Sequence, residues 1–163
     1  MPSVVEANLQ KMGITLPPPA SPAASYKPFV KVGNMVYISG QLPKGADGKL
    51  ITGQLGASLK SEEGKAAAES CALSLIAQMK AAAGGNLDLV SKVVMVRCYV
   101  NSTGDFHEHP AVANGCSDLL ARVFGEEIGR HARCAFGVAQ LPFNVAVEIE
   151  AQIELKGEAT ASL

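Results

Sequence analysis

The chain has 163 residues and a mass of 16.9 kDa, a length that suits one domain with a sizeable core. Fourteen Lys and Arg side chains nearly cancel fifteen Asp and Glu side chains, and this balance argues against a general nucleic-acid binder, which would carry a basic face. Aromatic residues make up only 5% and tryptophan is absent, which argues against platforms that stack nucleic-acid bases.

Composition and spacing also favour a cytoplasmic location. No apolar run approaches the roughly 20 residues that cross a bilayer. The first residues, MPSVVEANLQKMGI, have neither the basic nor the apolar region of a signal peptide. The cysteines lack the close pairs of a zinc site, so we expect reduced, buried thiols and neither a metal nor an organic cofactor; they are Cys71, Cys98, Cys116 and Cys134.

The N-terminal part of the chain is expected to precede the main domain. Ser3-Val4-Val5-Glu6 has the pattern of a capping box and predicts a short helix that stops near Gly13. The proline-rich segment Leu16–Pro28 predicts a linker or a surface arm. We therefore divide the chain into a helix and arm over residues 1–28, a domain over 29–155 and a frayed tail over 156–163.

The first half of that domain predicts a hairpin and a helix. Phe29–Val32 and Met35–Ser39 are β-rich and flank Gly33-Asn34, a pair typical of a tight turn. An apolar stripe at helical spacing follows and predicts a helix of about five turns that ends at Gly84-Gly85. The stripe consists of Ala68, Cys71, Ala72, Leu75, Ile76 and Met79.

The second half predicts three strands and one helix. Ser91–Asn101 is apolar on nearly both faces and predicts a central strand. A helix is expected over roughly Pro110–Phe124, and strands over Arg133–Leu141 and Val145–Leu155. The short connection Pro142-Phe143-Asn144 predicts that the last two strands form a hairpin.

The order β-β-α-β-α-β-β predicts an α+β fold in which two helices pack on one face of a single mixed sheet. The other face of the sheet would then be apolar and uncovered. We expect another copy of the chain to cover it.

Alternation in the last strand places three carboxylates, Glu148, Glu150 and Glu154, on one face. In one register of the expected hairpin, Arg133 shares that face with Glu148 and Glu150, beside small residues that leave room for a ligand. The same pattern also fits a solvated face with an exposed ion pair, which would contribute only about 0–1 kcal/mol.

Other chemistry-bearing residues carry weaker signals. His107, Glu108 and His109 stand together, but no further metal ligands accompany them, so a metal site is not indicated. Cys116 and Cys134 could act as nucleophiles, but neither has a clearly placed base, and we expect both to pack in the core. No GxGxxG, P-loop or HExxH motif is present.

Three segments resemble the YjgF/Rid family of enamine/imine deaminases, which is also called endoribonuclease L-PSP. They are GNMVYISGQLP (Gly33–Pro43), VNSTGDFHEHPAVANGCSDLL (Val100–Leu120) and ARCAFGVAQLPFNVAVEIEA (Ala132–Ala151). The resemblance covers roughly Pro28–Leu155 and identifies the chain with a longer subgroup of the family. It implies a chorismate-mutase-like α+β fold and a homotrimer with clefts between subunits.

The resemblance also implies a site. Arg133 would grip the substrate carboxylate, Glu148 would position the attacking water, and Ser39 and Gly40 would line the cleft. The asparagine that follows the DF motif in the family aligns best with Asn114. At a position where the family often has cysteine, this chain has Ala135, and either Tyr26 or Phe29 would be the aromatic residue that closes the cleft.

The function implied is hydrolysis of a small carboxylate-bearing enamine or imine, of the 2-aminoacrylate type, to a 2-keto acid and ammonia. Two alternatives stay open. One is a non-catalytic trimer that binds small carboxylates in the same cleft as a sensor or chaperone-like protein. The other is an endoribonuclease, which the net charge of −1 and the low aromatic content disfavour.

Overall fold

The structure is a computed structural model and describes residues 3–21 and 24–157. Its centre is a five-stranded sheet, in which the strands lie side by side in the order β1-β2-β5-β3-β4. The strands are β1 (Phe29–Val32), β2 (Met35–Gln41), β3 (Val90–Asn101), β4 (Ala132–Val138) and β5 (Val147–Leu155). All neighbouring strands are antiparallel except β3 and β4, which are parallel, so the sheet is mixed as predicted.

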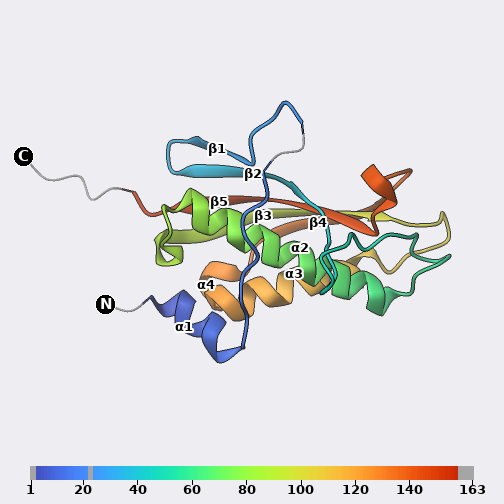
Figure 1. Ribbon diagram of the computed structural model, residues 1–163, viewed down its shortest axis with the longest axis horizontal. Coiled ribbons are helices and arrows are strands. Elements are labelled where there is room, and N and C mark those ends of the chain that lie inside the picture. The colour runs from blue at the N-terminus through green and yellow to red at the C-terminus, as the bar shows by residue number, and fades with distance from the viewer. Residues whose placement is uncertain (1–2, 22–23, 158–163) are drawn as a thin grey trace, which may run out of the picture.

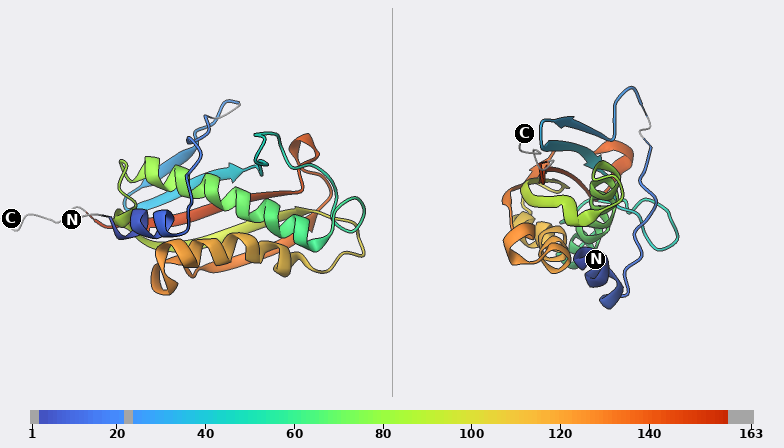
Figure 2. Two further views of the ribbon diagram at one scale, coloured as in Figure 1. Left: turned by 60° about the horizontal axis from the view of Figure 1, so that its bottom comes forward. Right: turned by 90° about the vertical axis from the view of Figure 1, so that its left-hand side faces the viewer.

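Two long helices, α2 (Ser61–Ala82) and α3 (His109–Phe124), lie side by side on one face of the sheet (Figures 1 and 2). Their apolar stripes bury Cys71, Leu75, Ile76, Cys116 and Leu120 against the strands. The predicted order of elements and the placement of both helices on one face are therefore confirmed. The short helix α4 (Glu126–Gly129) and the 3-10 turns η1 (Leu87–Leu89) and η2 (Pro142–Asn144) complete the elements.

The N-terminal helix α1 (Val4–Lys11) packs against α3 and η1. Ser3 caps it through its side chain, as the capping-box pattern predicts, and Val5 and Leu9 are buried. The backbone amides of Val4 and Val5 donate to the carboxylate of Asp88, and these bonds lower the pKa of that carboxyl. The arm then runs along α2, where Gln78 donates to the carbonyl of Ala20. Of the expected tail, residues 158–163 lie outside the described residues.

The predicted hairpin between the last two strands is wrong. β3 lies between β4 and β5, and it pairs with β4 in parallel and with β5 in antiparallel fashion. The turn Pro142–Asn144 therefore carries the chain across one strand instead of joining two neighbours. Because Arg133 lies beside the buried Val96, its side chain faces the helices, whereas Glu148 and Glu150 lie on the opposite face beside Tyr99 and Arg97. The predicted sharing of a face is therefore also wrong.

None of the described segments covers the sheet face opposite the helices. Val30, Val32, Tyr37 and Phe136 are exposed there. Cys134 also lies on this face and is exposed, which corrects the expectation that all four thiols are buried; Cys71, Cys98 and Cys116 are buried. Because Cys134 is in register with Arg97, whose side chain points away from the helices, the strand alternation turns Cys134 outward.

Candidate functional site

A β-bulge in β2 brings Gly40 against Glu148. Ile38 pairs with Ala151 and Gln41 pairs with Ile149, so Ser39 and Gly40 together face Glu150 alone. A Cβ on Gly40 would lie 2.1 Å from Oε1 of Glu148, so the carboxylate occupies the space that a side chain at position 40 would need. The sequence motif around Ser39 and Gly40 thus has a structural purpose, which is to make room for Glu148.

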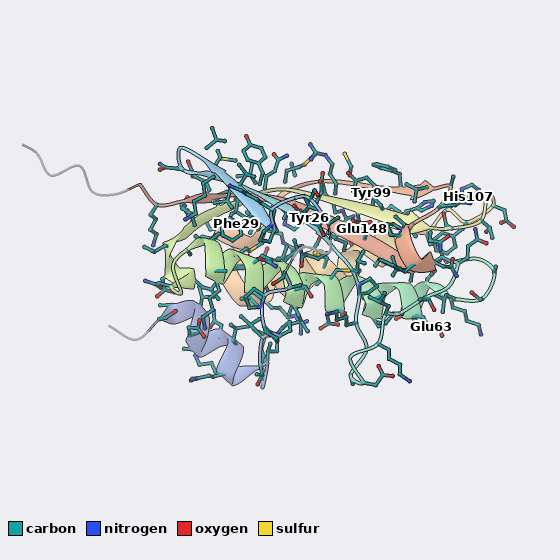
Figure 3. All side chains as sticks on the ribbon, turned by 45° about the horizontal axis from the view of Figure 1, so that its top comes forward. Tyr26, Phe29, Glu63, Tyr99, His107 and Glu148 are labelled. Carbon is teal, nitrogen blue, oxygen red and sulfur yellow. The ribbon has the colours of Figure 1, made fainter. Side chains whose placement is uncertain are left out.

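Glu148 and Glu150 lie on the same face of β5 but in different electrostatic environments. Glu150 accepts from Arg97 at 2.8 Å and from the hydroxyl of Tyr99 at 3.2 Å. Glu148 is half-buried, and among the described residues it has neither an ion pair nor a hydrogen bond. Burial, and secondarily repulsion from Glu150, raise the pKa of Glu148. Glu148, labelled in Figure 3, is therefore the carboxylate of this strand whose surroundings favour uptake of a proton.

The N-terminal arm is fastened beside this carboxylate by Ser39. The hydroxyl of Ser39 donates to the carbonyl of Lys27 at 2.7 Å, and its backbone amide donates to the carbonyl of Pro28 at 3.0 Å. Tyr26, which is 51% exposed, thereby lines a hollow of about 210 Å³ together with Gly40. Phe29 instead pairs with Ile38 and packs against the core, so the structure places Tyr26, and not Phe29, at the hollow.

Arg133 is held by α3 on the other side of the sheet. Its Nη1 donates to Oδ1 of Asn114 at 2.8 Å and to Oγ of Ser117 at 3.2 Å, and Nη2 donates to the carbonyl of Pro110 at 3.4 Å. Nε–H and one N–H of Nη2 remain uncommitted among the described residues, and they form one edge of the guanidinium. Such an edge binds a carboxylate in bidentate fashion. Ala135 lies two residues along the same face and packs against the core.

Two further polar residues, Ser117 and His131, contact each other next to Arg133. The sequence pattern did not single them out as functional. Nδ1 of His131 lies 2.7 Å from the carbonyl of Gly129, which can only accept, so Nδ1 carries the proton. In the neutral ring Nε2 then accepts from Ser117, at 2.9 Å, and this fixes the hydroxyl so that its lone pairs face Arg133. Burial, and to a smaller degree the charge of Arg133, lower the pKa of His131 and favour this neutral form.

The predicted site residues thus fall into two clusters within one chain. The first contains Glu148, Gly40, Ser39 and Tyr26, and the second contains Arg133 and Asn114, with Ala135 on the same face. β3 separates the strands that carry them, and the two key side chains point to opposite faces. Arg133 and Glu148 of the same chain therefore cannot hold one small substrate between them.

The weaker candidates lie apart from both clusters. Nε2 of His109 lies 3.0 Å from Oγ of Ser102, and Glu108 accepts from Ser61, so both are engaged locally. Within the described residues, no three His, Cys, Asp or Glu side chains come close enough together to hold a metal ion. Burial raises the pKa of Cys98 to about 12 and raises that of Cys116 further, which makes both thiols poor nucleophiles. None of the described helices is long and apolar enough to cross a membrane.

Comparison with known proteins identifies the family. Residues 6–155 match the family model described as "YjgF/chorismate_mutase-like, putative endoribonuclease". The chain is 56% identical to protein TCP17 of Trypanosoma cruzi over 151 residues, which are 93% of this chain and 94% of that relative. It is 29% identical to a 2-iminobutanoate/2-iminopropanoate deaminase of Dermatophagoides farinae over 144 residues, with 88% and 95% of the two chains covered.

A solved structure has the same fold over most of the chain. Protein Atu1372 of Agrobacterium tumefaciens, described as a protein of unknown function, superposes with a TM-score of 0.85 at 44% sequence identity, and 94% of each chain is covered. The match of the family model over nearly the whole chain, together with this fold, shows that the chain belongs to the YjgF/chorismate-mutase-like family.

Proposed function

We propose that this protein hydrolyses small imines that carry a carboxylate, including those formed from 2-aminoacrylate-type enamines, and releases 2-keto acids and ammonia. The observation that carries the proposal is the half-buried carboxylate of Glu148, which has no ion pair or hydrogen bond among the described residues, whose pKa is raised, and which lies against Gly40. Gly40 in turn lines a hollow together with Tyr26. A relative 29% identical to this chain is named as a 2-iminobutanoate/2-iminopropanoate deaminase, which supports the same reaction class.

The reaction needs a base and a group that binds the carboxylate of the substrate. The enamine first tautomerises to the imine, and water then adds to the imine carbon while Glu148 accepts a proton from that water. Glu148 passes this proton to the imine nitrogen, which gives the carbinolamine. It then takes the proton of the carbinolamine hydroxyl and transfers it to the nitrogen as the C–N bond breaks and the carbonyl forms, so that imine plus water gives keto acid plus ammonia. The uncommitted edge of Arg133 would hold the substrate carboxylate in a fixed orientation throughout.

We further propose that the cleft lies between copies of the chain, with Arg133 from one subunit and Glu148 from its neighbour. Within a single chain the two side chains lie on opposite faces of the sheet, so a shared substrate requires two copies. The surfaces open for such contacts include the edge strand β4, which carries Arg133, and the uncovered sheet face with Val30, Val32 and Tyr37. A homotrimer, which we expect from the family resemblance, would form three such clefts.

The decisive experiment follows the decay of freshly generated 2-iminopropanoate in the presence of wild-type protein and the variant Glu148→Gln. We expect the variant to bind pyruvate through Arg133 but to lose most of the rate enhancement, because an amide can orient water but cannot accept its proton. Glu154→Gln is the matched control, because Glu154 is exposed on the same face of the same strand.

Normal turnover by Glu148→Gln would contradict the catalytic role of this residue. If the wild-type protein binds pyruvate but does not accelerate the decay of the imine, the protein is a carboxylate-binding module and not a deaminase. Binding of RNA that weakens steeply with salt would favour a nuclease instead.

A further inference from the structure

We propose that the rings of Tyr99 and Phe136 receive the side chain of the substrate, so that the protein prefers imines whose side chain is apolar and larger than methyl, aromatic ones above all. The proposal rests on the proposed function, because the two rings are assigned by their place beside Glu148. Gly40, Glu148, Tyr99 and Phe136 form one row across the uncovered sheet face, on the strands β2, β5, β3 and β4. Tyr99 lies directly opposite Glu148, and the Cβ atoms of such cross-strand neighbours are about 5 Å apart.

The ring of Tyr99 is held in place from two sides. It meets Phe136 edge to face, with ring centroids 5.4 Å apart and an angle of 89° between the planes. Its hydroxyl donates to Oε1 of Glu150 at 3.2 Å. Burial, and then the charge of Glu150, raise the pKa of Tyr99, so the phenol keeps its proton. With its hydroxyl engaged, Tyr99 offers a ligand the carbon surface of its ring, and Phe136, which is 43% exposed, extends that surface.

This aromatic pair is separate from the apolar residues at the other end of the same face. Val30 pairs with Tyr37, and Tyr37 pairs with Gln152 of β5. Gln152 is four residues from Glu148 along β5, which corresponds to about 13 Å in a strand. A neighbouring copy of the chain can therefore cover Val30 and Tyr37 without covering the row of Glu148, which the proposed cleft requires to be open.

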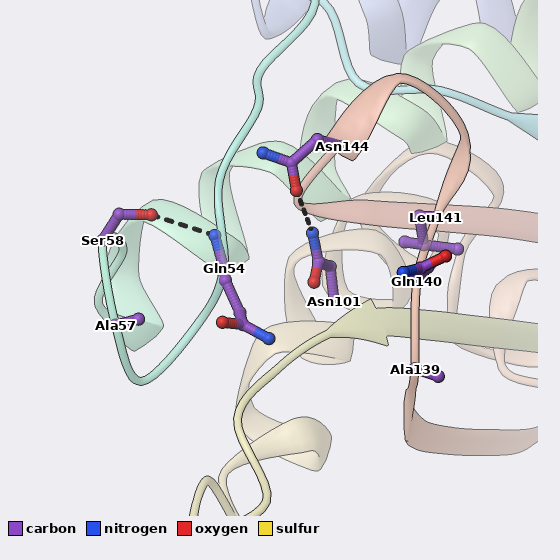
Figure 4. A pocket seen from close by; sticks show the side chains of 8 residues that line it. All are labelled: Gln54, Ala57, Ser58, Asn101, Ala139, Gln140, Leu141 and Asn144. Carbon is purple, nitrogen blue, oxygen red and sulfur yellow. Dashed lines mark hydrogen bonds between the residues drawn. The ribbon is translucent and has the colours of Figure 1, made fainter.

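The same face becomes polar one step further along β3. Asn101, two residues after Tyr99, lines a hollow with four other uncharged polar residues, which are Gln54, Ser58, Gln140 and Asn144 (Figure 4). Its Nδ2 donates to Oδ1 of Asn144 at 3.0 Å and to the carbonyl of Val145 at 3.2 Å. An apolar side chain placed there would remove polar groups from water without pairing them. We therefore expect the substrate side chain to lie over the two rings and not in this hollow.

The chemistry of the imine carbon places its side chain beside Glu148. This carbon carries a nitrogen, a carboxylate and the side chain, and in the proposed cleft Arg133 of a neighbouring subunit holds the carboxylate. On one side of Glu148 its own carboxylate fills the space at Gly40, whereas Tyr99 lies on the other side. A methyl group would leave the two rings in contact with water, and a larger apolar side chain would cover them. A side chain that ends in a carboxylate would be repelled by Glu148 and Glu150.

The test compares two imines, one derived from pyruvate and one from phenylpyruvate, each generated in the assay by an amino-acid oxidase. We expect wild-type kcat/KM to be about tenfold higher for the phenylpyruvate imine. Phe136→Ala should abolish this preference and change kcat/KM for the small imine by less than about twofold, because a methyl group does not reach the ring. Leu89→Ala is the matched control, since Leu89 is 40% exposed and precedes β3 at its far end.

Two conservative variants separate the rings from other roles of these residues. Phe136→Leu keeps an apolar side chain and should restore part of the preference. Tyr99→Phe removes the hydroxyl but keeps the ring, so the preference should persist even if the overall rate changes. An equal loss for both imines in Phe136→Ala would show that Phe136 supports the fold or a subunit contact, and it would overturn the proposal.

Binding of the keto acids separates this proposal from the proposed function. If neither imine is hydrolysed, but phenylpyruvate binds more tightly than pyruvate in calorimetry and Phe136→Ala removes the difference, the deaminase assignment fails and the aromatic subsite stands. If both imines are hydrolysed with the same kcat/KM, the deaminase assignment stands and the subsite is overturned. A protein that neither hydrolyses the imines nor binds either keto acid would overturn both.

Discussion

The carboxylate of Glu148 occupies the space beside Gly40 in which any larger residue would place its side chain, since a Cβ there would lie 2.1 Å from Oε1. The bulge at Ser39 and Gly40 creates this space, and the Ser39 hydroxyl at the same bulge fastens the arm that carries Tyr26. One local irregularity of β2 thus positions both the carboxylate and the arm that carries Tyr26.

The first prediction concerns Gly40→Ala. The added methyl group would displace the Glu148 carboxylate, so we expect loss of most imine hydrolysis while the fold persists. Steady-state kinetics and circular dichroism would measure the two effects. Gly104→Ala is the control, because a Cβ at Gly104 meets nothing within 4 Å. Wild-type activity in Gly40→Ala would show that the position of Glu148 does not matter.

The second prediction concerns the pH profile of kcat/KM. Glu148 must be ionised to act as a base, so the rate should rise with pH through its raised pKa, above the usual carboxylate range. Repulsion from Glu150 contributes to this raised pKa. Glu150→Gln should therefore shift the rising limb toward lower pH. A limb that does not move, in a variant that stays folded, would assign the titration to another group.

The third prediction concerns stability. Because the pKa of Glu148 is higher in the folded than in the unfolded chain, wild-type stability should decrease as pH rises through the folded-state value. Glu148→Gln does not ionise and avoids this loss. Its free energy of unfolding from urea titrations should exceed that of wild type at neutral pH, and the difference should vanish below about pH 4, where the unfolded carboxyl is also protonated. Glu154→Gln, at an exposed position, should show no such gain.

The sequence predicted the elements of this fold better than their pairing. Hydrophobic periodicity is local, and it correctly indicated α2, α3 and the five strands. The pairing of β4 with β3 is parallel and links residues far apart in sequence, whereas the short turn at Pro142–Asn144 favoured a local hairpin. The ion pair of Glu150 with Arg97 was missed for the same reason, although an arginine within the mainly apolar run from residue 93 to residue 100 was a signal for it.

The separate locations of Arg133 and Glu148 could not be read from the sequence either. Family resemblance put both residues in one site, but only the strand order shows that they lie on opposite faces of a chain. The outward orientation of Cys134 likewise depends on its register with Arg97. The space shared by Gly40 and Glu148 depends on the bulge, which has no sequence signature beyond the glycine itself.

The fourth prediction concerns the residues behind Arg133. Ser117→Ala removes the hydroxyl that accepts from Nη1 and donates to His131, so the guanidinium would be held less firmly. We expect KM to rise several-fold with a smaller change in kcat, because substrate is bound less well before the chemistry. Arg122→Lys is the control, since Arg122 forms an exposed pair with Glu69 away from this network. An equal loss in both variants would indicate a general effect on stability.

The fifth prediction tests whether the site is shared between subunits. Arg133→Lys keeps one positive charge but removes the planar fork, so it should abolish hydrolysis, and Glu148→Gln should do so by removing the base. If one cleft takes Arg133 from one subunit and Glu148 from the next, mixed oligomers of the two inactive variants contain some clefts with both native residues. Co-expression and purification through distinct tags should therefore restore part of the activity, in oligomers that sediment at about 50 kDa, three times the chain mass of 16.9 kDa. Mixed oligomers that stay inactive, or a protein that remains monomeric at micromolar concentration, would exclude the shared cleft. They would also leave Arg133 and Glu148 without a common substrate, because β3 separates their strands within one chain.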